Sequence, residues 1–194
     1  RTYLASVCVC LWAADAIAGG EGCDMTKKIR RGTECLRKAV QQSKEYEGKI
    51  KEFAENCSAP AIMGRGYSMG SVAAGALFLR EVAKIPAMEF DEAEFKHGPL
   101  EMVEKGFKAV ILAPEGEGML MNVRMAESIV KKGGEVLLIT DGSCTALEEE
   151  RLRIIRLERS EEAAAALFQI VPIQILANSL AKNRGICPGK FRWS

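Results

Sequence analysis

A glycine-rich turn between a short apolar strand and a helix of small residues constrains the fold of this 194-residue chain most. Ala61–Met63 is apolar, positions 64–71 read Gly-Arg-Gly-Tyr-Ser-Met-Gly-Ser, and Gly70–Ala83 is rich in alanine and glycine. Such a turn leaves free backbone N–H groups at the helix start, which together with the helix dipole suit an anionic ligand. Gly-x-Gly turns are common in strand-to-helix connections, so a tight turn without a ligand is the alternative interpretation.

Strand-like and helix-like segments alternate from residue 60 onward. After the strand at 61–63, further strands are expected at 107–113, 136–140 and 154–157. The first of these three is a near-continuous apolar run, typical of a parallel strand covered on both faces. The alternation predicts an α/β fold with a doubly wound, mainly parallel sheet of about five strands flanked by helices.

The last apolar segment is expected to be one long helix that runs to Leu180. Ser160 is expected to cap it, and Pro172 is expected to kink it, because proline lacks the backbone N–H of a helix interior. A shorter turn of helix is expected at Asp91–Lys96, followed by another that begins at Gly98–Pro99.

The N-terminal part is expected to be helical. Thr2–Ala18 predicts a buried helix that the following glycines stop, and a Lys/Glu-rich region from Asp24 to about Ala54 predicts two helices broken near Gly48. We therefore divide the chain into leading helices at 1–56 and an α/β domain at 57–194.

The first helix allows a second interpretation. Its apolar run ends in Ala-Ile-Ala, as secretory signals do, although Asp15 interrupts it. The run is too short and too interrupted for a membrane span.

Composition excludes several classes of function for this chain. The 27 basic and 26 acidic residues give a net charge of +1, which argues against a dedicated nucleic-acid binder. The seven cysteines are scattered without a C-x-x-C pair, so we expect reduced thiols in a cytoplasmic protein rather than a zinc site or a disulfide framework. The sequence contains no metal-ligand cluster, Walker loop or G-x-S-x-G elbow, and no cofactor is expected.

Glu81 and His97 are the candidates for acid–base chemistry. Glu81 lies in the C-terminal half of its helix, where a carboxylate opposes the helix dipole, so its placement can serve something other than stability. The alternative is a surface carboxylate paired with Arg80 or Lys84. His97 is the only histidine, and histidine is the residue type whose normal pKa lies near neutrality, but a histidine beside Gly-Pro is often just a loop residue.

The turn supplies the candidates for substrate binding. These are Gly64, Arg65, Gly66, Ser68 and Ser71. Their backbone N–H groups, hydroxyls and guanidinium can contact a phosphate or a sugar hydroxyl. For the two serines, helix capping is the alternative.

Three motifs in register carry a resemblance to a known family: Gly64–Gly66, Ala76–Glu81 and Glu94–Pro99. They resemble the second sugar isomerase (SIS) domain of the isomerising glutamine–fructose-6-phosphate aminotransferases. The related amino-sugar-phosphate deaminases and deglycases are similar in the same motifs. The resemblance covers nearly the whole chain, and its N-terminal helix looks like the connection out of a first SIS domain rather than a signal.

The resemblance implies a function and a site. It implies a phosphosugar isomerase domain in which Glu81 moves a proton between C1 and C2 of a hexose or amino-sugar 6-phosphate. It implies that His97 assists ring opening from the neighbouring subunit, and therefore that the protein is a homodimer. It also implies a first SIS domain upstream, which holds the substrate phosphate in the family.

The sequence departs from the family at several positions. The family has a lysine where Phe78 stands and a further acid where Ala74 stands. The segment Gly185–Trp193 resembles the family's C-terminal tail and keeps Arg192, but it lacks both acids. These losses keep a second interpretation open, a non-catalytic SIS module for sugar-phosphate binding or dimerisation.

Overall fold

Five parallel strands form one sheet in the computed structural model, which describes residues 2–141, 144–146, 148–190 and 192–193. The strands are β1 (Ala61–Gly64), β2 (Met88–Asp91), β3 (Lys108–Ala113), β4 (Glu135–Asp141) and β5 (Leu152–Leu157). Their order is β2-β1-β3-β4-β5, and each neighbouring pair is parallel. The expected doubly wound α/β sheet is confirmed.

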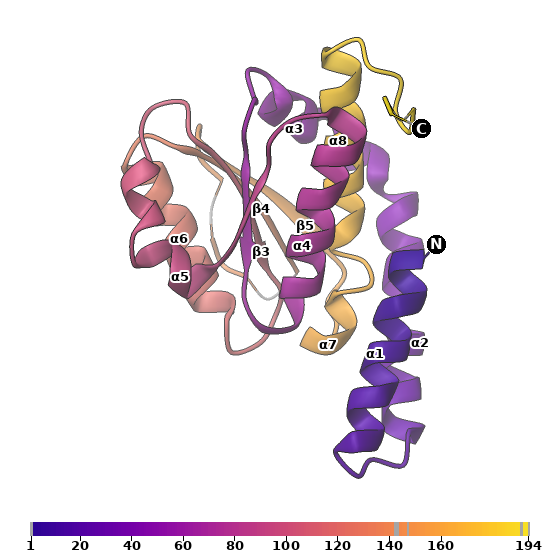
Figure 1. Ribbon diagram of the computed structural model, residues 1–194. Coiled ribbons are helices and arrows are strands. Elements are labelled where there is room, and N and C mark those ends of the chain that lie inside the picture. Colours follow the sequence, from indigo (N-terminus) through magenta and orange to yellow (C-terminus); the bar gives the residue numbers. More distant parts are fainter. Residues whose placement is uncertain (1, 142–143, 147, 191, 194) are drawn as a thin grey trace.

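Helices cover both faces of this sheet (Figure 1). The α-helices are α1 (Thr2–Ile17), α2 (Cys23–Gln41), α3 (Ser43–Ala54), α4 (Met69–Phe78), α5 (Glu92–Lys96), α6 (Met119–Lys131), α7 (Glu162–Ala165) and α8 (Ile170–Asn183). Three short turns complete the described elements: the 3₁₀ helices η1 (Gly66–Ser68) and η3 (Pro99–Met102), and the π-helix η2 (Leu79–Ala83).

The central strands β1, β3 and β4 bury both of their faces, which explains their largely apolar sequences. Side chains alternate along each strand, so Val110 and Leu112 join one core with α3, α4 and α8, while Ala109 and Ile111 join a second core with α6. The window Glu162–Asn183 is long and apolar enough to cross a membrane, but 78% of it is buried inside the protein. This segment, which contains α7 and α8, therefore belongs to the helices that pack on the sheet and form the core.

The sheet order reverses direction between β1 and β3. From β1 the chain crosses to β2 on one side, and from β3 it crosses to β4 and then β5 on the other. The turns that follow β1 and β3 therefore diverge at the carboxyl edge of the sheet. In doubly wound sheets this switch point is the usual place for a ligand.

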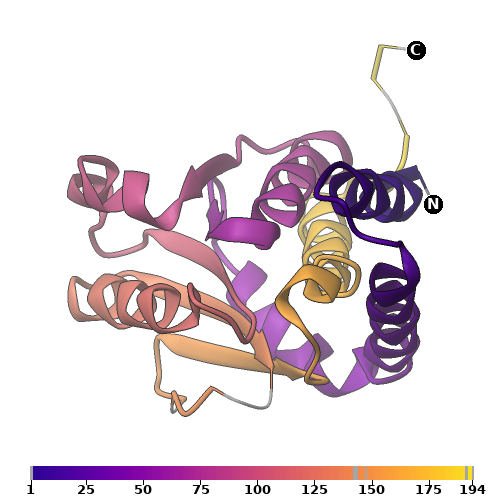
Figure 2. The ribbon, with the colours of Figure 1, turned by 90° about the horizontal axis from the view of Figure 1, so that it is seen from below.

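The first helix is exposed rather than buried as expected. Within α1 only Leu11 is buried, whereas Val9, Trp12 and Ile17 are 64%, 52% and 88% exposed. The helix lies beside α2, and both stand apart from the sheet, outside the α4–α8 layer (Figure 2). The apolar sequence predicted a core position for α1. Within the described residues, other segments leave much of Val9, Trp12 and Ile17 uncovered, so these side chains are exposed.

The break in the second helical region lies at Gln42, and not near Gly48 as expected. Helix α2 ends at Gln41 and α3 begins at Ser43. Gly48 lies within α3, where a Cβ would meet nothing within 4 Å. Its position costs only glycine's helix propensity, so it did not need to end the helix.

The expectations for the C-terminal helix were wrong, and one strand was missed. The expected single helix from Ser160 is two helices, and Pro172 is the third residue of α8. Proline is tolerated there because the first-turn N–H groups have no partner within the helix. Ser160 does not cap α7, whose preceding residue is Glu161. No strand was expected at Met88–Asp91, which forms the edge strand β2.

Candidate functional site

Close packing requires glycine at the two ends of the β1 turn. A Cβ on Gly64 would lie 3.1 Å from the Cβ of Ser68 and 3.2 Å from Cγ2 of Val72. Gly66 has a φ of +58°, in the left-handed region that side chains disfavour. The turn therefore folds as tightly as its sequence predicts.

The hydroxyls of Ser68 and Ser71 point into the protein. Ser68 Oγ donates to Gln169 Oε1 at 3.2 Å, and Gln169 Nε2 donates to Ser71 Oγ at 3.0 Å. Ser71 Oγ also donates to the carbonyl of Ala166 and lies 2.7 Å from the Tyr3 hydroxyl. Burial raises the pKa of Tyr3 despite its bond to Ser71. Ser68 stands at the N-cap position of α4, but neither serine makes a capping hydrogen bond, so the capping alternative is wrong. The hydroxyls instead bond to Gln169 and Ala166, which precede α8, and to Tyr3 of α1.

Arg65 reaches across to the connection after β2. Its Nη1 lies 3.4 Å from Oε2 of Glu92, the nearly buried first residue of α5. The side-chain stem of Arg65 packs against Gly118, where a Cβ would lie 3.2 Å from that of Arg65. The Arg65 side chain is 40% exposed, so it is still accessible to a ligand at the carboxyl ends of the strands.

Glu81 lies in a π-helical turn. The N–H of Lys84 donates to the carbonyl of Leu79, five residues back, and Lys84 adopts a left-handed φ of +56°. π-Helical turns are rare and frequent at functional sites, and a left-handed conformation costs a residue with a side chain about 1–3 kcal/mol. The local backbone thus favours a role for Glu81 beyond helix stability.

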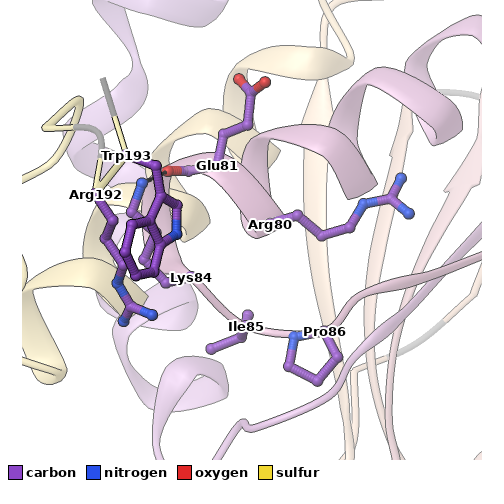
Figure 3. Close-up of a pocket in the computed structure, with 7 residues that line it drawn as sticks. All are labelled: Arg80, Glu81, Lys84, Ile85, Pro86, Arg192 and Trp193. Carbon is purple, nitrogen blue, oxygen red and sulfur yellow. Dashed lines mark hydrogen bonds between the residues drawn. The ribbon is translucent and has the colours of Figure 1, made fainter.

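An open pocket of about 570 Å³ surrounds this end of the helix (Figure 3). It is lined by Arg80, Glu81, Lys84, Ile85, Pro86, Arg192 and Trp193. Arg192 and Trp193 come from the C-terminal tail, whose Phe191 and Ser194 lie outside the described residues. Three cations and one carboxylate therefore line a pocket suited to an anionic molecule.

The exposed carboxylate of Glu81 points away from Ile85 and Pro86 (Figure 3). The cations beside it have other contacts. Arg80 pairs with Glu89 of β2 at 3.0 Å, and Lys84 Nζ donates to the backbone carbonyl of Glu81 at 2.5 Å. The Arg80 pairing expected in the surface alternative is thus made with a different acid.

The structure does not bring His97 to Glu81 within one chain. Glu81 comes before β2 in the chain, whereas His97 comes after β2 and directly follows α5. The two residues therefore lie toward opposite ends of the strands, Glu81 toward the amino end of β2 and His97 toward its carboxyl end. His97 is exposed, and its backbone N–H donates to the carbonyl of Glu94 at 3.1 Å. The turn at Gly64–Ser71 lies at the carboxyl edge, away from the Glu81 pocket.

Sequence reasoning missed a carboxylate at the turn, that of Glu162. Its oxygens lie 2.9 Å from the position of a Cβ on Gly66 and 2.2 Å from that of a Cβ on Gly116. Burial raises the pKa of Glu162, as does repulsion from Glu117, and a bond from the Glu117 backbone N–H opposes the shift. The sequence showed Glu162 only as an acid at a helix start, because the contact joins segments about 100 residues apart.

The profile of the SIS domain matches residues 57–184 of this chain. The chain belongs to the SIS domain family. The division at 56 and 57 into leading helices and domain remains a prediction.

Individual relatives are isomerizing glutamine–fructose-6-phosphate aminotransferases. The Escherichia coli K12 protein is 28% identical over 160 residues, which cover 81% of this chain and 26% of the relative. The Methanothermobacter thermautotrophicus protein is 28% identical over 194 residues, which cover 98% of this chain and 32% of the relative. This SIS chain thus spans about a quarter to a third of the length of these curated relatives.

Solved structures show the same fold. The C-terminal domain of glucosamine–fructose-6-phosphate aminotransferase from Francisella tularensis aligns with a TM-score of 0.78 at 21% identity, covering 88% of this chain and 48% of that one. A glucosamine-6-phosphate deaminase from Thermotoga maritima aligns with a TM-score of 0.60 at 21% identity, covering 93% and 51%. The SIS chain is thus similar to about half of each solved chain.

Proposed function

We propose that this SIS chain is the isomerase part of a longer enzyme that acts on a hexose or amino-sugar 6-phosphate. Glu81 moves a proton between C1 and C2 of the opened sugar, as an aminotransferase, a deaminase or a deglycase requires. The family match and the names of the aminotransferase relatives support this proposal. Because the chain spans only part of those relatives, the activity belongs to the longer protein.

The observation that carries the proposal is the setting of Glu81. Its carboxylate lies at a π-helical turn, in an open pocket lined by Arg80, Lys84 and Arg192. A carboxylate is a suitable base for proton transfer between adjacent carbons, and the cations attract an anionic sugar phosphate. Proton transfer of this kind needs no cofactor.

The separation of Glu81 and His97 favours a site shared between two subunits. Because one chain places them toward opposite ends of its strands, His97 would open the sugar ring in the site of a neighbouring copy. A homodimer is therefore part of this proposal. We further propose a first SIS domain upstream and a cytoplasmic location, in line with the metabolic role of the named relatives.

Substitution of Glu81 in the full-length protein tests the base. Glu81→Gln keeps the size and removes the basicity, so exchange of the C1/C2 hydrogen with solvent deuterium should fall by roughly 10²–10⁴. Glu101→Gln, at another exposed acid, is the matched control and should exchange at the wild-type rate. Undiminished exchange in Glu81→Gln would refute the assignment.

Mixing two inactive variants tests the shared site. His97→Asn should slow reaction from the cyclic sugar more than from an open-chain analogue. A mixed dimer of Glu81→Gln and His97→Asn would have one composite site with both residues intact, so activity should partly recover. If subunits are shown to exchange and no activity returns, the site is not shared.

The non-catalytic alternative has its own support. Phe78 and Ala74 pack against the core where the resemblance implies polar groups, and Ser68 and Ser71 face inward. A binding module would take up fructose 6-phosphate without exchanging its hydrogens. Residues 1–194 alone should give no turnover in either case, because the phosphate is expected to bind in the first SIS domain.

A further inference from the structure

We propose that Glu162 serves as an internal anion that occupies the switch-point crevice and excludes a substrate phosphate from the glycine turn. The crevice lies between the turn after β1 and the segment Pro114–Gly118 after β3, where the sheet order reverses. Ligand phosphates commonly bind at this position in doubly wound sheets, on backbone N–H groups of a glycine-rich turn.

Three contacts fix the carboxylate there. It lies over the faces of Gly66 and Gly116, so close that a Cβ at either position would collide with its oxygens. The backbone N–H of Glu117, two residues before α6, donates to it. Helix α7, which Glu162 begins, packs against the η1 turn (Figure 1). A carboxylate from the segment after β5 therefore takes the position of a ligand's anionic group.

Charges around the crevice are balanced by other groups of this chain. Arg159 forms a two-bonded ion pair with Glu115 of the β3 turn, and Arg65 pairs with Glu92. An incoming phosphate would meet the Glu162 carboxylate and cations that already have acidic partners. Repulsion and competition both oppose its binding.

Stability does not account for the carboxylate. Burial and the nearby Glu117 raise the pKa of Glu162, which means that the folded protein disfavours its charged form. A neutral side chain of the same shape would fit the crevice at lower cost. The charge is thus better explained by the phosphate that it excludes from the glycine turn.

This inference rests on the proposed function and refines it. The turn residues Gly64, Arg65, Gly66, Ser68 and Ser71 would shape the fold and the dimer's active site, while the sugar phosphate binds elsewhere in the longer protein. Glu162 would then be a residue that determines where an anion can bind. It takes no part in the proton transfer.

Phosphate titration tests the inference without any activity measurement. In the ¹⁵N-labelled chain, the amide signals of Gly66, Gly116 and Glu117 are followed as inorganic phosphate is added. We expect no saturable shift in the wild type and a saturable shift in Glu162→Ala. Fructose 6-phosphate should behave in the same way.

Two further variants separate charge from shape. Glu161→Ala removes the adjacent acid, which lies 3.6 Å from Lys28, and should behave as the wild type. Glu162→Gln keeps the fold even if the alanine variant loses it, and should bind phosphate more tightly than the wild type. Wild-type binding at these amides, or no gain in both Glu162 variants, would overturn the inference. Undiminished hydrogen exchange in Glu81→Gln would refute the proposed base without changing the phosphate result expected here.

Discussion

The hydroxyl of Tyr3 lies 2.7 Å from Oγ of Ser71, and this contact links the N-terminal helix α1 to helix α4 behind β1. The same hydroxyl lies 2.9 Å from the carbonyl of Ala166 and donates to it. A helix with only Leu11 buried is thus tied to the core at its first turn by a hydrogen-bonded tyrosine.

Removal of that hydroxyl should weaken the fold modestly. Tyr3→Phe deletes the bonds to Ser71 and Ala166 but keeps the ring, so we expect a loss of about 1 kcal/mol in the free energy of unfolding. Urea denaturation measures it. Tyr67→Phe, at an exposed tyrosine, is the control. Equal stabilities of the two variants would mean that the hydroxyl anchors nothing.

Two glycines should respond to alanine with opposite signs. Gly66→Ala places a Cβ in a left-handed residue and 2.9 Å from the Glu162 carboxylate, so it should destabilise by about 1 kcal/mol or more. Gly48→Ala lies within α3 with open space around it, and should stabilise by about 0.5–1 kcal/mol. Thermal melting of both variants checks the pair, and a shared sign would contradict it.

Neutralising Glu135 should be costly, because its partner is buried. Lys108, 6% exposed, donates from Nζ to Glu135 Oε2 and to the carbonyl of Phe53, both at 3.1 Å. Glu135→Ala leaves this charge without its carboxylate and should cost about 2–4 kcal/mol. Lys108→Met, which removes the buried charge itself, should cost less. Chemical denaturation that reverses this order would refute the argument.

The raised pKa of Glu162 predicts a pH-dependent effect of Glu162→Gln. An acid whose folded pKa exceeds its unfolded value stabilises the fold below the unfolded pKa, about 4.3, and this contribution is lost as the pH rises through the folded value. The glutamine variant should therefore be more stable than the wild type near neutral pH and equally stable near pH 3. Melting curves across this range test it, with Glu161→Gln as the control. A constant difference at all pH values would contradict the prediction.

The central strands could be predicted from sequence because their burial is complete. After Lys108, β3 is an unbroken apolar run. β4 contains a second apolar run, and the segment between the two strands is long enough for a helix. The edge strand β2 gave no such signal, since Met88–Asp91 mixes two acids with two apolar residues and is only partly covered. Strand prediction here followed the degree of burial.

The site was less predictable, because its contacts are distant in sequence. The glycine turn and the carboxylate at Glu81 are local patterns that can be read directly from the sequence, and their roles stay predictions. The inward direction of Ser68 depends on Gln169, which lies 101 residues away, and no local pattern reveals it. The exposure of Trp12 depends likewise on which surfaces lie beside α1.

Because Leu79–Ala83 form a π-helical turn, the direction in which the Glu81 side chain points depends on how many residues this turn contains as well as on which residues they are. In an α-helix, one residue more or fewer rotates all that follows by about 100°. Here the widened turn absorbs one residue between Leu79, which stays in the core, and Lys84. Deletion of Val82 would keep every chemical group of the pocket and yet change how they face one another. Divergence among such domains can therefore proceed through single insertions and deletions, which comparison of residue types alone would overlook.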